Sequence, residues 1–309
     1  MILPDLNTYR LNFEAKGIVR PLKIVPSSKK GLLNVLPAPS KDKTGWCWTE
    51  QTDPQIYVDH SSWPKITIVS PSFNQGIFLE ETIRSVLLQN YPNLEYIVID
   101  GGSTDNSPAI LEKYSPWISY WQSEKDEGQG QAINFGFSLG SGEYYAWINS
   151  DDYYLENVFN TVINTFLSTK TEFIYGYGYR KNVSDNKLII SKILPLLDYF
   201  IKIPGLIQPS TFWKSSIHRP IWEELECAID YELWLRLVKG KRRQLVKKPL
   251  SVAYIHNEAK THNIQMKAKW HEDHLKTWAL DAHGPVPEWN RIVFLNRIRF
   301  KIYKMLKLI

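Results

Sequence analysis

The segment from Lys65 to Asn149 constrains the fold most, because short β-branched runs alternate in it with amphipathic runs. Strand patterns cover residues 65–70, 94–100, 117–122 and 143–149, and helix patterns lie between them at residues 77–89, about 106–114 and about 129–139. Strands that are joined through helices run parallel, since a parallel connection needs a crossover. The sequence therefore predicts an α/β fold with a doubly wound, mostly parallel sheet flanked by helices.

The segments on either side of this pattern have a different character. Residues 1–63 are rich in turn formers, as in VPSSKKG (25–31) and LPAPSKDKTG (36–45), and we expect an extension that wraps a domain at residues 64–275. The chain opens without a basic-then-apolar leader and holds no apolar run of about 18 residues, so we expect a cytoplasmic protein. Cys47 and Cys227 have no metal-binding spacing, which fits a reducing compartment.

The positive charge belongs to the predicted tail, residues 276–309. Six of the 37 basic residues and no acidic ones follow from Arg291 onward, which leaves 31 basic against 32 acidic residues before it. No nucleic-acid-binding signature occurs in the body of the chain, so nucleic acid is not an expected partner. Apolar residues of the tail recur at helical steps (Ile292, Leu295, Ile298, Ile302, Met305, Ile309), and basic residues cluster opposite them (Arg297, Lys301, Lys304, Lys307). Two interpretations stay open: a helix lying on the anionic inner face of a membrane, or a helix docked on the domain with a solvated basic face.

Four loops follow the predicted strands, and three of them carry carboxylates. They are PSFNQG (71–76), DGGSTD (100–105), EKDEGQG (124–130) and NSDD (149–152). Ligands of open α/β sheets bind beyond the carboxyl ends of the strands, where these loops meet. The adjacent pair Asp151 and Asp152 could cap a helix starting at Tyr153, but the gathering of acidic residues favours a ligand or a divalent cation such as Mn²⁺ or Mg²⁺. Neither a dinucleotide fingerprint nor a P-loop is present, so a diphosphate would be held through a metal bridge.

Several segments together resemble a known family. ITIVSPSFNQGIFLEETIRSVLLQNYPNLEYIVIDGGSTDNS (66–107) and DEGQGQAINFGFSLGSGEYYAWINSDD (126–152) are similar to the nucleotide-binding half of the family 2 glycosyltransferases, which have the Rossmann-like GT-A fold. QPSTFWKSS (208–216) and AIDYELWLRL (228–237) are similar to the acceptor half of that family. The resemblance covers roughly residues 65–262, and its specificity comes from the order and spacing of the motifs.

This resemblance implies roles for individual residues on the donor side. The residues that would line the nucleoside pocket are Pro71, Ser72, Phe73, Asn74 and Asp100, and those on the ribose or diphosphate side are Asp126, Gly128 and Gln129. NSDD would be the D-x-D motif, with Asn149 where the family often has aspartate. Asp151 and Asp152 would then share the ribose and metal contacts, with Asp152 favoured as the metal ligand. His256 would approach the metal or diphosphate, or else it packs or hydrogen-bonds as an ordinary histidine; His262 is a weaker candidate.

Asp230 is the predicted catalytic base. It stands at the start of a segment with helical spacing, where aspartate commonly serves as an N-cap, and it also matches the family position of the base. A sugar hydroxyl is a poor nucleophile, and a carboxylate can take its proton as the new bond forms. The two roles are compatible, since a helix N-terminus helps to keep a carboxylate ionised.

The function implied is that of an inverting, metal-dependent glycosyltransferase. It would move a sugar from a nucleotide-diphosphate donor, of the UDP or dTDP type, to a hydroxyl of a glycan or lipid-linked acceptor in surface polysaccharide synthesis. The alternative is a non-catalytic protein of the same fold that binds nucleotide sugars or glycans, which Asn149 favours. A nucleotidyltransferase would need a glycine- and basic-rich loop after the first strand, and PSFNQG does not provide one.

Overall fold

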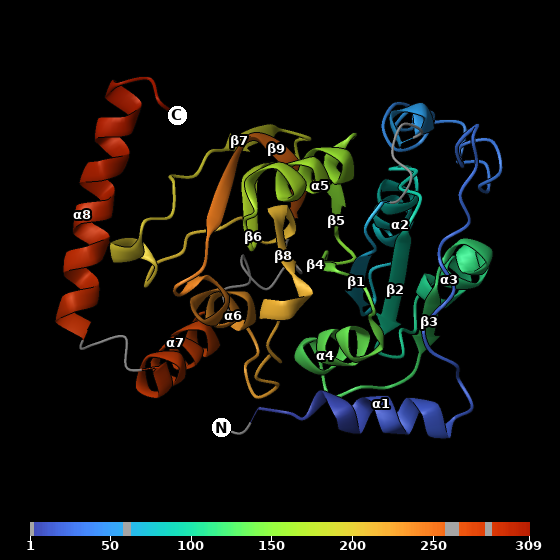
Figure 1. Cartoon of the computed structure of the whole chain (residues 1–309), viewed down its shortest axis with the longest axis horizontal. Coiled ribbons are helices and arrows are strands. Elements are labelled where there is room, and N and C mark those ends of the chain that lie inside the picture. The colour runs from blue at the N-terminus through green and yellow to red at the C-terminus, as the bar shows by residue number, and fades with distance from the viewer. Residues whose placement is uncertain (1–2, 58–62, 257–265, 282–285) are drawn as a thin grey trace.

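A computed structural model describes residues 3–57, 63–256, 266–281 and 286–309 (Figure 1). Its described residues form one nine-stranded sheet. From one edge the order is β3 (Tyr120–Ser123), β2 (Leu94–Asp100), β1 (Ile66–Ser72), β4 (Tyr144–Trp147), β8 (Thr211–Lys214), β6 (Phe173–Asn182), β9 (Arg243–Ile255) and β5 (Asp152–Tyr154), and β7 (Leu188–Ser191) pairs with β6.

The sheet changes character at β4. Strands β3, β2, β1 and β4 are parallel, with Ser72 beside Asp100 at the carboxyl end. Beyond β4, β8 runs antiparallel to both of its neighbours, β6 and β9 are parallel, and β5 and β7 are antiparallel additions. The predicted α/β sheet with flanking helices is confirmed. Its parallel part is the half that the strand and helix patterns covered, and the later strands are mixed because short links such as residues 183–187 permit only antiparallel pairing.

Eight α-helices occur in the described residues: α1 (Leu6–Ala15), α2 (Leu79–Leu87), α3 (Ser107–Tyr114), α4 (Gln129–Leu139), α5 (Val158–Thr169), α6 (Ile229–Val238), α7 (Lys267–Asp281) and α8 (Val286–Met305). The predicted strand 94–100 and helix 129–139 have the observed bounds. The first strand runs on to Ser72, so Pro71 and Ser72 lie inside β1 rather than in the loop after it. The strand predicted from residue 117 begins at Tyr120, because Pro116 lies in a 3₁₀ turn, Ser115–Trp117.

Both faces of the parallel strands are buried, as a sheet covered by helices on two sides requires. In β1, Ile66 and Ile68 pack in one hydrophobic cluster with residues of α2, α3 and α5. Val69 points the other way, into a cluster with residues of α4 and α6. Helix α4 lies close to β1 at Gly136, where an added Cβ would come within 2.5 Å of Val69 Cγ1. This close packing fixes the start of α4 at the carboxyl edge of the sheet.

The N-terminal extension reaches both faces of this sheet (Figure 1). Helix α1 packs on α4, where Phe135 makes edge contacts with Phe13 at 6.2 Å and with Tyr9 at 6.1 Å between ring centroids. On the opposite face the fully buried Arg84 of α2 donates to the carbonyls of Pro37, Cys47 and Trp48 in the extension. The extension is thus tied to the sheet domain by buried hydrogen bonds. Its predicted limit at residue 63 stays a prediction, and residues 58–62 lie outside the described part.

The tail helix α8 lies along one side of the molecule (Figure 1). Its Ile292 is buried, and Arg299 donates to the carbonyl of Pro195, so one face of the helix is docked. Other apolar side chains of α8 are exposed, among them Phe294 and Met305. Within the described residues, none of the helices combines the length and the apolar character needed to cross a membrane. The predicted boundary between residues 275 and 276 stays a prediction and falls within α7.

Candidate active site

The loop after β2 is built around the carboxylate of Asp100. This buried side chain accepts hydrogen bonds from Ser103 N (2.9 Å), Ser103 Oγ (2.5 Å) and Ser123 Oγ (2.6 Å). Hydrogen bonds to an ionised acceptor are among the stronger ones in proteins, so the three donors hold the loop firmly. Asp100 therefore shapes the loop that begins at the end of β2.

The loop after β1 is bonded to this structure. Asn74 N donates to Ser103 Oγ at 2.7 Å, and Asn74 Oδ1 accepts from Thr104 N at 2.9 Å. Asn74 has φ +53°, a left-handed conformation that asparagine tolerates better than most residues. Ser72 Oγ is buried and has no hydrogen-bond partner among the described residues, and the neighbouring Phe73 is 59% exposed. The predicted nucleoside-pocket residues 71–74 and Asp100 thus lie side by side at one sheet edge.

The third loop brings Asp126 against the backbone that follows Asp100. A Cβ added at Gly101 would lie 2.9 Å from both carboxylate oxygens of Asp126. Burial is the main cause that raises the pKa of Asp126, and the charges of Asp100 and Glu127 add to it. Its Oδ1 accepts from Gly128 N at 2.9 Å, and Gly128 has φ +115°, which glycine alone adopts readily. This edge is therefore negatively charged and partly desolvated.

The start of α4 is joined to the NSDD segment. Gln129 Nε2 donates to Asn149 Oδ1 at 2.9 Å, so two residues that the resemblance placed on the ribose and diphosphate side are in direct contact. Gln208 Nε2 donates to the carbonyl of Trp147, the last residue of β4, also at 2.9 Å. The segment QPSTFWKSS is thereby anchored beside NSDD.

Asp151 pairs with His256, 105 residues later in the chain. Strand β5 adds antiparallel to β9, with Asp152 opposite Ala253, so the residue before β5 meets the residue after β9. His256 Nε2 lies 3.1 Å from Asp151 Oδ2, and the two side chains are 9% and 20% exposed. The imidazole also packs on the ring of Phe78, at 4.9 Å between centroids. The β5–β9 pairing therefore brings a carboxylate and an imidazole together at the candidate site.

Asp152 has a more enclosed environment than Asp151. Its side chain is 6% exposed, and its Oδ1 accepts from Tyr254 N of β9 at 3.2 Å. Burial raises the pKa of Asp152 well above its ordinary value, and the neighbouring charge of Asp151 raises it further. These surroundings make Asp151 the more accessible carboxylate of the pair.

A divalent cation fits this arrangement only in part. Among the described residues, no three His, Cys, Asp or Glu side chains lie close enough together to enclose a metal ion. Mg²⁺-type sites on nucleotide enzymes commonly use one or two protein ligands together with phosphate oxygens and water. The Asp151 carboxylate and the His256 imidazole match that open type, in which the diphosphate completes the coordination. His262 lies outside the described residues.

Asp230 is the second residue of α6, and Ala228 occupies the N-cap position, so the predicted capping role is not observed. Asp230 Oδ1 accepts from the adjacent Tyr231 N at 2.8 Å, and no ion pair of this carboxylate is found in the described part of the chain. Burial raises the pKa of Asp230 above its ordinary value. A carboxylate without a cationic partner and with a raised pKa is a better proton acceptor than an ordinary surface aspartate.

Stacked tryptophans place α6 against the end of β4. The rings of Trp147 and Trp234 lie 5.3 Å apart at an angle of 13°. Asp230 precedes Trp234 by four residues, so the two project from the same face of α6, with Asp230 one turn nearer the helix start. Trp147 in turn lies two residues before Asn149, the first residue of NSDD. The Trp147–Trp234 contact thus joins α6, which carries the base candidate Asp230, to the end of β4, which leads into the acidic pair.

The turn before α6 is held by Asp273, a residue that no sequence pattern pointed to. Its buried Oδ2 accepts from the backbone N–H groups of Glu226, Cys227 and Ala228 at 2.9, 2.7 and 3.1 Å. This carboxylate belongs to α7 and acts as the N-terminal cap of α6. Three donors at the start of α6 depend on one side chain that follows 45 residues later.

We expect Asp273→Ala to lower the free energy of unfolding by about 2–4 kcal/mol, because it leaves buried N–H groups without acceptors. Chemical denaturation followed by circular dichroism measures this. Glu272→Ala is the matched control, since the neighbouring Glu272 makes an exposed ion pair with Lys276, and its loss should leave the free energy of unfolding close to that of the parent protein. Equal losses for both variants would contradict the capping role.

Other contributors escaped the sequence reasoning for different reasons. Ser103 and Asp105 belong to the quoted DGGSTD loop, and turn-forming serine and aspartate next to a strand end are a recognisable signal. Asp105 Oδ2 accepts from Gly76 N at 2.7 Å and so joins two loops. Tyr254 and Phe78, which stack at 4.9 Å beside His256, carried no signal, since their contact depends on β9.

Comparison with solved structures gives the class of this fold. The chain superposes on S. aureus TarS residues 1–349 in complex with UDP-GlcNAc. The TM-score is 0.55 at 18% identity, over 75% of this chain and 72% of that TarS 1–349 chain. It also superposes on the mannosyltransferase PcManGT of Pyrobaculum calidifontis, in complex with GDP-Man and Mn²⁺. The TM-score is 0.51 at 13% identity, over 97% of this chain and 90% of PcManGT. The architecture is therefore that of the GT-A glycosyltransferases.

Sequence comparison gives the family. Residues 67–218 match the model of Glycosyl transferase family 2 and belong to that family. A glycosyltransferase of Rickettsia bellii (strain RML369-C) is 31% identical over 232 residues, which is 67% of this chain and 33% of the relative. The chain thus spans about a third of that relative's length, and 59% of the similar Rickettsia typhi protein.

Proposed function

We propose that this protein is an inverting, metal-dependent glycosyltransferase that uses a nucleotide-diphosphate sugar. The observation that carries the proposal is the arrangement at the carboxyl edge of the sheet. Four separate loops meet there and present the Asp151–His256 pair, and the Trp147–Trp234 contact brings α6, which carries Asp230, against the end of β4. A donor diphosphate at the pair and an acceptor hydroxyl at Asp230 would share one sugar between them.

On the donor side, the loops after β1, β2 and β3 would bind the nucleoside, and Gln129 with Asn149 would face the ribose or diphosphate. Asp151 and His256 would hold the cation, and the buried Asp152 would not be a direct ligand. This assignment differs from the sequence-based preference for Asp152 as the metal ligand. When bound, Mn²⁺ or Mg²⁺ would neutralise the charge that develops on the departing diphosphate. A donor of the UDP or dTDP type agrees with the UDP-GlcNAc present in the TarS complex.

On the acceptor side, Asp230 would accept the proton of the acceptor hydroxyl. The hydroxyl oxygen would bond to the anomeric carbon while the bond from that carbon to the diphosphate oxygen breaks. Attack from the face opposite the leaving group inverts the anomeric centre. The acceptor would be a glycan or a lipid-linked sugar in surface polysaccharide synthesis, and the cytoplasmic location predicted from the sequence belongs to the same proposal.

A second candidate is a protein of this fold that binds nucleotide sugars without turnover. Asn149 favours it, because its amide oxygen is already engaged by Gln129 and carries no charge for a metal. The carboxylate of Asp230 favours the enzyme instead. Burial raises its pKa, and it makes no ion pair among the described residues, as a catalytic base requires and a binding protein does not.

A panel of nucleotide sugars incubated with Mn²⁺, Mg²⁺ or chelator decides between the two. We expect slow hydrolysis of one donor that the chelator abolishes. Binding of a donor without any hydrolysis or transfer in the presence of candidate acceptors would support the second candidate. Turnover that is unchanged by chelator would contradict the proposed metal dependence.

The pH profile of transfer should reflect the environment of Asp230. Only the ionised carboxylate can accept a proton, and burial raises its pKa, so kcat/KM should fall with decreasing pH at a higher pH than the ordinary value for aspartate of about 3.9. Steady-state rates across the acidic range measure the midpoint. A rate that stays constant down to about pH 4 would contradict the role of Asp230 as base.

A further inference from the structure

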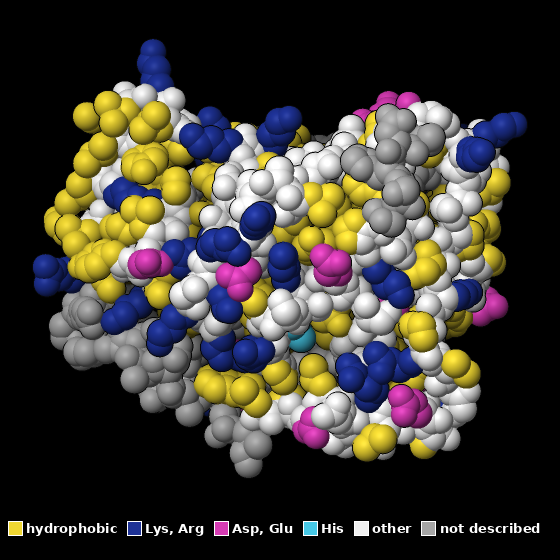
Figure 2. All heavy atoms as spheres, viewed as in Figure 1, with side chains coloured by type: hydrophobic (Ala, Val, Ile, Leu, Met, Phe, Trp, Pro, Cys, Tyr) yellow, Lys and Arg dark blue, Asp and Glu magenta, His cyan; other side chains and the backbone are white. Residues whose placement is uncertain are grey.

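Helix α8 exposes a stripe of apolar side chains that no described part of the molecule covers. Phe294, Ile298, Ile302 and Met305 follow one another at helical steps of four, four and three residues and therefore share a face. Phe294 is 62% and Met305 78% exposed. Figure 2 shows hydrophobic side chains gathered over α8, with Lys and Arg at the edges of this patch. Apolar patches with a polar rim mark sites of interaction.

The basic side chains lie along one flank of this stripe. Arg297, Lys301 and Lys304 each precede a stripe residue by one position, which turns them by about 100° around the helix. All three are exposed, and from Arg291 onward the helix has no acidic residue. The sequence suggested a basic face opposite the apolar one, and the helix instead places these cations beside it. Flanking lysines and arginines can reach lipid headgroups while the apolar face inserts.

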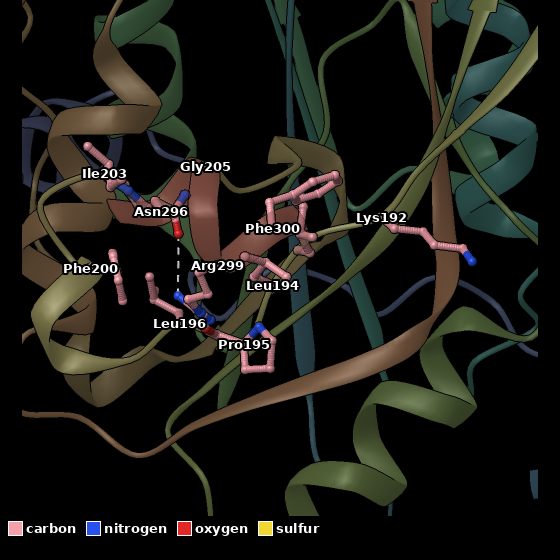
Figure 3. Close-up of a pocket in the computed structure, with 12 residues that line it drawn as sticks. Lys192, Leu194, Pro195, Leu196, Phe200, Ile203, Gly205, Asn296, Arg299 and Phe300 are labelled. Atoms are coloured by element: carbon pink, nitrogen blue, oxygen red, sulfur yellow. Dashed lines mark hydrogen bonds between the residues drawn. The ribbon is translucent and has the colours of Figure 1, made fainter. Parts of the chain in front are cut away.

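A pocket of about 130 Å³ lies between α8 and residues 192–205 (Figure 3). Its residues from α8 are Asn296, Arg299 and Phe300, which at about 100° per residue project from the side of the helix turned away from the stripe. The pocket therefore belongs to the docked side of α8 and not to its exposed surface.

Arg299 holds this docked side of α8 in place. Its guanidinium lies 4.6 Å from the ring centroid of Phe200 and donates to the carbonyl of Pro195 and to Asn296 Oδ1 at 3.4 Å. The helix is thereby fixed with its apolar stripe and the neighbouring cations facing outward.

We infer that helix α8 docks the protein onto an anionic phospholipid membrane, with the apolar stripe inserted between headgroups and Arg297, Lys301 and Lys304 binding lipid phosphates. The charge of the surface is complementary to such a membrane, and the stripe supplies the apolar contact that charge alone lacks. The inference concerns binding, so it does not depend on the transferase activity.

Sedimentation of the 309-residue protein with vesicles tests it. We expect binding to vesicles that contain phosphatidylglycerol, little binding to pure phosphatidylcholine, and release at high salt. The double variant Ile302→Ser/Met305→Ser should bind at least about tenfold more weakly, and Lys301→Gln/Lys304→Gln about fivefold more weakly. Leu167→Ser, which changes an exposed leucine on α5, is the control and should bind like the parent protein.

Other outcomes would overturn the inference. Equal binding to both kinds of vesicle, or equal weakening by the control, would exclude a specific anionic docking surface. A dimer in light scattering that Ile302→Ser/Met305→Ser dissociates, without vesicle binding, would assign the stripe to a second copy. Binding to a polyprenyl phosphate in phosphatidylcholine vesicles, but not to phosphatidylglycerol, would assign this surface to a lipid-linked acceptor. Thermal unfolding of each variant separates lost binding from lost structure.

Discussion

Asp230→Asn is expected to reduce kcat for sugar transfer by roughly 10²–10⁴-fold, the usual contribution of a general base. Asparagine keeps the shape of the side chain and can still accept from Tyr231 N, so the start of α6 should be preserved. It cannot take a proton from the acceptor hydroxyl. Transfer rates with saturating donor and acceptor measure the loss, and donor affinity should stay near that of the parent protein, because the base acts on the acceptor.

Glu224→Gln provides a matched control for this result. It makes the same chemical change at an exposed carboxylate in the turn before α6, and it should leave kcat unchanged. Circular dichroism should show parent-like folding for both variants. If Asp230→Asn transferred sugar at the parent rate, Asp230 would not be the base and the proposed mechanism would fail on the acceptor side.

Asp151→Asn is expected to weaken Mn²⁺ binding in the presence of UDP by more than about tenfold, because it removes the charged partner of the proposed ligand pair. The His256 imidazole remains, but one neutral ligand and an amide hold a divalent cation poorly. Electron paramagnetic resonance of free Mn²⁺ measures the affinity without relying on turnover. Chelator-sensitive hydrolysis of the donor should fall in parallel.

Glu156→Gln is the control for this second experiment, since Glu156 is an exposed carboxylate a few residues beyond NSDD. It should bind Mn²⁺ like the parent protein. Unchanged affinity in Asp151→Asn combined with a loss in Asp152→Asn would return the ligand role to Asp152. Unchanged affinity in both would remove the metal from the proposed site.

The parallel half of the fold could be predicted because its information is local. Each strand between Ile66 and Trp147 is a short run of β-branched or aromatic residues, and each crossover helix carries its own apolar spacing, so residues 94–100 and 129–139 are found with their observed bounds. The rule that parallel strands end at one edge then placed the loops with Asp100, Asp126 and NSDD together. In this half, the predicted and observed bounds differ only near the ends of strands and helices, as at Ser72.

The contacts within the site could not be predicted in the same way. The pairing of Asp151 with His256 requires β5 to add to β9, which joins residues about 100 positions apart. The difference in burial between Asp151 and Asp152 also arises there, since alternate residues of a short strand point to opposite sides. A sequence pattern that reads only neighbouring residues contains neither fact.

The sequence by itself determined the class of the sheet, the position of its ligand edge and the family resemblance, because hydrophobic periodicity and loop motifs are properties of contiguous residues. Tertiary structure alone decided which acidic side chain is accessible, that Asp273 rather than Asp230 caps α6, and which apolar side chains of α8 remain exposed. Those features depend on burial and on contacts between distant segments, which exist only after the chain has packed.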